Sequence, residues 1–104
     1  MELNIHYKNI QDATKETTRS QLEEKLHDVL KMFGEFEDED QAVATAHIEH
    51  FEKHKEYTVR VQLKIRKKGK EYSFVVEEKR KADLLACMNE VKHDLQAMVR
   101  KGKE

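Results

Sequence analysis

The sequence predicts a single α+β domain over residues 1–104, a two-layer sandwich in the order β-α-β-β-β-α with a four-stranded sheet. Two patterns predict it. Residues 57–66 alternate strictly between apolar and polar side chains, as a strand with one buried face does. Residues 22–33 and 84–99 each carry an apolar stripe at helical spacing. One apolar sheet face and two apolar helical stripes satisfy each other if both helices lie on that face.

Three further strands follow from shorter alternating runs. Residues 2–7 alternate, and residues 41–51 place a row of small alanines on one side, which would let a helix approach the sheet closely. Residues 67–70 form a tight turn in which Gly69 can take a positive φ, and residues 72–76 continue the alternation after it. We therefore expect the last three strands to form an antiparallel meander.

The first helix is expected from about residue 14 to residue 33. Asp12 or Thr14 can cap its first turn, and Gly34 stands where a left-handed helix end costs least. The second helix is expected over residues 81–100, and we expect the four residues after it to fray.

Charge is distributed unevenly although the formal net charge is only −1. Residues 34–40 hold five acids and no base, which favours a solvated loop over a binding feature. Residues 56–81 hold nine bases against four acids. Such a basic block attracts phosphates without reading sequence, but a solvated or edge-protecting face has the same composition, so both interpretations stay open.

Signatures of catalysis, metal binding and membrane insertion are missing from the sequence. It has no CxxC, HExxH, GxGxxG, GxxxxGK[ST] or GxSxG motif, and we interpret its six histidines as surface residues. Cys87 lies in or beside an apolar helical stripe, which is typical of a buried, inert thiol. No apolar run approaches the roughly 18 residues that span a bilayer. We expect a cytoplasmic non-enzyme with no cofactor, no small-molecule substrate and no membrane partner.

Several short stretches, taken in order, resemble a known family. The chain opens with Met1-Glu2-Leu3-Asn4-Ile5, followed by Lys8-Asn9-Ile10; its first helix ends in Met32-Phe33, and Asp83 to Asn89 is similar to the family's entry into its second helix. The family is the short form of the ribosome hibernation promoting factors, also called ribosome-associated inhibitors or sigma-modulation proteins. Its members bind the small ribosomal subunit where messenger and transfer RNA would lie, and they silence translation under stress or slow growth.

The resemblance implies a translation inhibitor that promotes hibernation by binding ribosomal RNA of the small subunit. Longer members carry a C-terminal dimerisation domain, which we do not expect here. Arg19 and Lys25 match bases of the family's first helix, and Lys101 and Lys103 match bases near the end of its second. With the neighbouring bases, the predicted RNA-binding residues are Arg19, Lys25, Lys64, Arg66, Lys92, Arg100, Lys101 and Lys103.

Four positions depart from the family pattern. Asp28 stands where a base is usual, Asp94 and Ala97 replace a Lys and an Arg, and Leu85 replaces a Tyr. Three lost phosphate contacts would weaken ribosome binding at physiological salt. The alternative function is therefore a protein-interaction or regulatory module that keeps the scaffold and has lost RNA binding. A small enzyme is a third class, and it would require a pocket holding perturbed titratable groups.

Overall fold

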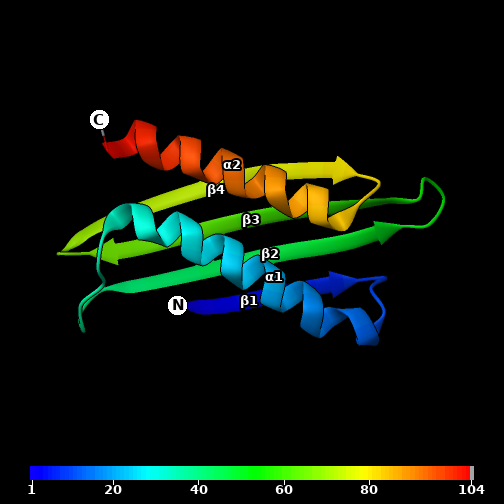
Figure 1. Cartoon of the computed structure of the whole chain (residues 1–104), viewed down its shortest axis with the longest axis horizontal. Coiled ribbons are helices and arrows are strands. Elements are labelled where there is room, and N and C mark those ends of the chain that lie inside the picture. Colours follow the sequence, from blue (N-terminus) through cyan, green and yellow to red (C-terminus); the bar gives the residue numbers. More distant parts are fainter. Residues whose placement is uncertain (104) are drawn as a thin grey trace.

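The computed structural model describes residues 1–103, and for Lys103 it describes the backbone alone. It contains one four-stranded sheet in the order β1-β2-β3-β4, with two helices on one face (Figure 1). The predicted α+β sandwich and its element order are confirmed. The elements are β1 (Glu2–Lys8), α1 (Asp12–Leu30), the 3-10 turn η1 (Lys31–Phe33), β2 (Gln41–Phe51), β3 (Glu56–Lys67), β4 (Lys70–Lys81) and α2 (Leu84–Lys103).

The sheet is mixed because α1 carries the chain back across it before the meander begins. β1 pairs in parallel with β2, and Leu3 lies opposite Ala44. β2, β3 and β4 are antiparallel, so that Ile48 faces Val59 and Leu63 faces Phe74. The two turns of the meander and the crossover therefore leave the same apolar face toward the helices.

The core lies between that face and the two helices. Ala44 and Ala46 of β2 are fully buried in the same hydrophobic cluster as Leu22 and Leu26 of α1. The largest fully buried side chains belong to both helices and to β2, β3 and β4: Leu22, Leu26, Val29, Ile48, Val59, Val61, Leu63, Ile65, Val76, Met88, Val91 and Leu95.

The boundaries around α2 differ from the sequence prediction. β4 continues to Lys81 rather than ending near Val76, and α2 begins at Leu84 rather than at residue 81. Lys79 and Lys81 stay in the strand because they lie opposite Val59 and Tyr57 of β3, and their side chains also reach carboxylates of α2. The prediction that the chain frays after residue 100 was also wrong for Lys101 to Lys103, which are helical. Glu104 lies outside the described residues.

The start of α1 has no side-chain cap, so the capping prediction was wrong. Its N-cap residue is Gln11, and the Thr14 hydroxyl instead donates to the Gln11 carbonyl over 2.8 Å. The predicted hairpin turn is confirmed, because Lys68 and Gly69 both have positive φ, as a tight two-residue turn requires. The predicted left-handed helix end at Gly34 was wrong: α1 ends at Leu30, and Gly34 follows the 3-10 turn with φ +81° and ψ −160°, outside the left-handed helical region.

Candidate nucleic-acid interface

Two ion pairs fix the direction of α2 over β4. Lys81 Nζ lies 3.5 Å from a carboxylate oxygen of Glu90, and Lys79 Nζ lies 2.6 Å from Asp94. Asp94 lies one turn after Glu90 on α2, whereas its partner Lys79 comes before Lys81 on β4, so the two elements run in opposite directions. Gly102, in the last turn of α2, lies beside the ring of Phe74. α2 therefore runs toward the β3–β4 turn, as Figure 1 shows.

This direction brings cations from two distant parts of the sequence to one end of the molecule. Each is exposed, and the structure records no ion pair for their side chains within the part of the chain it describes. The charge of Lys68 does act on Asp40, whose pKa it helps to lower. Unpaired cations bind phosphate more readily than paired ones because no ion pair has to be broken first. We call this group the hairpin end: Lys68, Lys70, Arg100 and Lys101.

Two of the predicted RNA-binding residues on the helix side are engaged within the protein. Arg19 Nη2 donates to the main-chain oxygen of Leu3 over 2.9 Å, which ties α1 to β1. Lys25 Nζ donates to the side-chain oxygen of Asn89, which ties α1 to α2. Both side chains therefore form hydrogen bonds that hold the fold together, in addition to any RNA contact.

Lys92 faces one of the acids that depart from the family pattern. Its Nζ lies 3.0 Å from Asp28 Oδ2 across the two helices, and Lys31 Nζ lies 3.5 Å from the other oxygen. The hydrogen bond from Lys92 and its positive charge hold the pKa of Asp28 below its usual value. Asp28 thus stays ionised and offsets the charge that Lys92 would present to a phosphate.

Asp94, the second of these acids, acts in the same way on Lys79. Its hydrogen bond and charge raise the pKa of Lys79. The ion pair joins α2 to β4, so the replacement of a base by an acid at this position fastens the helix to the sheet.

Lys64 and Arg66 lie on the open face, the side of the sheet away from the helices. They alternate along β3 with the buried Leu63 and Ile65, so their side chains point the opposite way. Arg66 Nε lies 3.8 Å from a carboxylate oxygen of Glu71. The predicted set is thus divided between two faces and one end, and the side chain of Lys103 lies outside the described part of the chain.

The open face also holds a stacked histidine pair. The rings of His6 and His47 are 4.8 Å apart and nearly parallel, and burial followed by the charge of Arg60 lowers the pKa of His47. Among the described residues, no three His, Cys, Asp or Glu side chains come together as metal ligands would. Neither described helix has a stretch apolar and long enough to cross a bilayer.

Lys68 and Lys70 were not in the predicted RNA-binding set. The available signal was the single Gly69 between them, which marks a turn and therefore places both lysines at a tip. That tip lies beside the end of α2 only because of how the helix packs.

Comparisons with known proteins show which solved structures share this fold. No family model matches the chain, and no curated protein sequence matches it. A ribosomal subunit interface protein from Coxiella burnetii superposes with a TM-score of 0.59 over 99% of this chain and 98% of its own, at 15% identity. The Protein Y N-terminal domain from Thermus thermophilus superposes with a TM-score of 0.54 over 94% and 99%, at 16% identity. The chain shares its fold with both. The family resemblance seen in the sequence is confirmed at the level of fold.

Proposed function

We propose that this protein is a ribosome-associated inhibitor of translation that occupies the messenger and transfer RNA channel of the small subunit under stress. The observation that carries the proposal is the shared fold with a ribosomal subunit interface protein over nearly the full length of both chains. The resemblance in sequence points to the same class. Inhibition by occupancy requires a shape that fits and contacts that hold it, with no reaction at the site.

Ribosomal RNA phosphates supply the contacts. The hairpin end presents four exposed cations from one turn and one helix terminus, and none has an ion pair recorded within residues 1–103. If each neutralises one phosphate, the binding constant falls with salt with a logarithmic slope of about 3.6, at about 0.9 per contact on duplex calibration. Such contacts hold the protein in register and carry no base information, so recognition depends on the shape of the RNA.

Sucrose-gradient sedimentation with purified small subunits tests the proposal. We expect the protein to travel with the subunits at low salt and to dissociate progressively toward physiological salt. The informative variant is Lys68→Gln with Lys70→Gln, which we expect to weaken association about 10-fold or more at physiological salt. A translation reaction in the same buffer should lose inhibition in parallel.

The chain offers a matched control in its other hairpin turn. Lys53 and Lys55 are also exposed turn lysines, and Lys55 has φ +50° where Lys68 has φ +52°. Lys53→Gln with Lys55→Gln removes the same charge at the opposite end of β3, so we expect it to leave association unchanged. Protein that stays at the top of the gradient at both salt concentrations would contradict the proposal.

A second candidate function is a protein-interaction module on the same scaffold. The observation in its favour is that Asp28 and Asp94 neutralise Lys92 and Lys79, which removes positive charge from the helix side. Affinity capture from a lysate treated with nuclease separates the two functions. Recovery of small subunits that is lost on nuclease treatment supports ribosome association, and recovery of a defined non-ribosomal protein that resists nuclease supports the module.

A further inference from the structure

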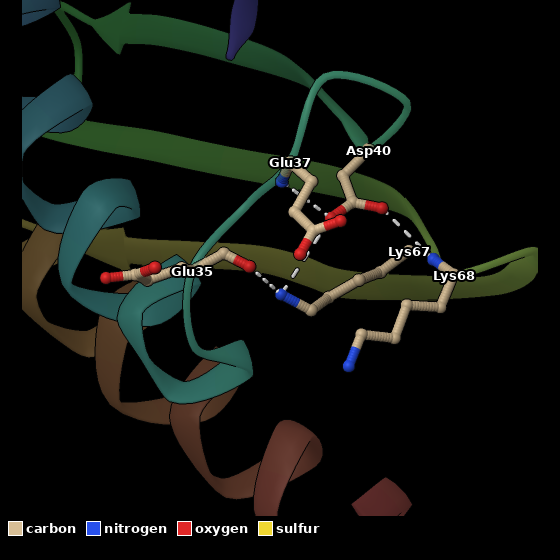
Figure 2. Close-up of polar contacts among 5 residues, drawn as sticks. All are labelled: Glu35, Glu37, Asp40, Lys67 and Lys68. Carbon is tan, nitrogen blue, oxygen red and sulfur yellow. Dashed lines mark hydrogen bonds and ion pairs between the residues drawn. The ribbon is translucent and has the colours of Figure 1, made fainter.

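The acidic loop, residues 35–40, is fastened to the β3–β4 hairpin by Lys67 (Figure 2). Lys67 Nζ donates to the main-chain oxygen of Glu35 and lies 4.0 Å from Asp40 Oδ2. It also lies 4.7 Å from the centre of the Phe36 ring. The side chains of Lys67 and Asp40 are only 12% and 4% exposed. Lys67 is therefore used within the protein, in contrast to the lysines that follow it.

Asp40 makes the second attachment. Its Oδ1 accepts a hydrogen bond from the main-chain nitrogen of Lys68 over 3.0 Å, and its Oδ2 accepts one from the main-chain nitrogen of Glu37 over 2.8 Å. These two bonds hold the pKa of Asp40 below its usual value. The main-chain nitrogen of Asp40 also donates to the Glu37 carbonyl, which closes the turn. The loop thus has a defined position on the hairpin.

Three carboxylates of the loop take no part in this attachment. Glu37, Asp38 and Glu39 are exposed, and the structure records no ion pair for their side chains within residues 1–103. They are held between residues that contact Lys67 and Lys68, and so they lie at the same end of the molecule as the free lysines of the turn. Fixed negative charge therefore accompanies the cations that the proposed function assigns to phosphate.

We propose that the acidic loop competes with RNA phosphates for the cations of the hairpin end. The inference rests on the proposed function, because it requires that the hairpin end contact RNA. The three free carboxylates lower the positive potential at the turn and repel an approaching phosphate. Only an RNA that presents several phosphates at once, in a fixed arrangement, gains enough contacts to overcome that repulsion. The loop thereby favours a structured RNA over scattered polyanions and keeps binding reversible.

The expected size of the effect follows from charge screening. Charges farther apart than a Debye length, about 10 Å at 0.1 M salt and about 30 Å at 0.01 M, are largely screened from each other. Three carboxylates beside the turn therefore act strongly at low salt and weakly at high salt. We expect their removal to tighten RNA binding about 3- to 10-fold at about 0.03 M salt, and to have little effect at about 0.5 M.

The test compares two variants of equal net charge. The loop variant carries Glu37→Gln, Asp38→Asn and Glu39→Gln, which leave the Lys67 and Asp40 attachments intact. The control carries three substitutions of exposed acids on α1 and the β2–β3 turn: Glu16→Gln, Glu24→Gln and Glu52→Gln. The probe is a fluorescein-labelled RNA stem-loop, and affinity is measured by anisotropy across a salt series with the full chain.

We expect the loop variant to bind the stem-loop more tightly than the control variant at low salt, and the two to converge at high salt. Adding Lys68→Gln and Lys70→Gln to the loop variant should abolish the gain. Equal affinities of the loop and control variants, or no binding of the RNA by any variant, would overturn the inference. Failure of the proposed function would give a different result. The loop variant would still bind the stem-loop more tightly than the control variant does, but the protein would not co-sediment with small subunits.

Discussion

Asp28 and Lys92 join the two helices through an ion pair in which Oδ2 and Nζ are 3.0 Å apart. Asp28 is the residue that stands where the resembled family has a base, and Lys92 is one of the predicted RNA-binding residues. The pair therefore converts a surface that would attract phosphate into a contact between α1 and α2. It also gives a direct way to change the charge that the helix side presents.

Substitution of Asp28 by Asn should release Lys92 to the solvent and strengthen RNA binding. One added phosphate contact would steepen the salt slope by about 0.9 on duplex calibration. Anisotropy with a labelled fragment of small-subunit ribosomal RNA, repeated across a salt series, measures this slope. Asp12→Asn is the matched control because Asp12 is also on α1 and also pairs with a lysine three residues along. Equal slopes for the two variants would show that Lys92 does not reach the RNA.

Acid should destabilise the protein below about pH 4, the usual range of carboxyl groups. Asp12, Asp28 and Asp40 all have lowered pKa values, because each accepts hydrogen bonds and lies near lysines. A carboxyl whose pKa is lower in the folded than in the unfolded chain contributes stability above its unfolded pKa, and loses it as the pH falls through its folded pKa. Urea unfolding at pH 5 and at pH 3 should show this loss, and the loss should be smaller in Asp28→Asn.

The thiol of Cys87 should be protected until the protein unfolds. It is fully buried and donates to the main-chain oxygen of Lys79 over 3.2 Å. Burial raises its pKa, so little of the reactive thiolate forms at neutral pH. The rate of labelling by a thiol reagent should follow the unfolded fraction through a urea titration. Labelling in native buffer at the rate of the unfolded chain would contradict the buried position.

A larger side chain in the alanine row of β2 should destabilise the sandwich. Ala46 is fully buried between the sheet and the helices, so Ala46→Leu forces side chains or backbone to move, at a cost of about 1–3 kcal/mol. Ala97→Leu is the control because Ala97 is exposed on α2, where such changes stay within about 0.5 kcal/mol. Urea unfolding followed by circular dichroism measures both.

The fold could be predicted because its patterns are local. Strict alternation along residues 57–66 identifies β3, and the stripes of the helices identify the face they bury. The end of β4 could not be predicted in the same way. Lys79, Arg80 and Lys81 look like a polar linker, and they are strand residues because they continue the pairing with β3. The two lysines also form ion pairs with acids of α2.

The candidate site was less predictable because its electrostatics depend on residues far apart in the sequence. Lys92 and Asp28 are 64 positions apart, and so are Lys25 and Asn89. No periodicity links such pairs, so the sequence could not show which cations are neutralised. The hairpin end likewise needs the packing of α2 on β4, which brings Lys101 to the same end as Lys68.

The salt dependence of binding to purified small subunits shows whether the hairpin end contacts ribosomal RNA. The dissociation constant is measured from about 0.05 to 0.3 M salt for the natural chain, for Lys68→Gln with Lys70→Gln, and for Lys53→Gln with Lys55→Gln. We expect a linear logarithmic plot whose slope falls by about 1.8 in the first variant and stays unchanged in the second. Equal slopes for all three proteins, or no binding at any salt concentration, would contradict it.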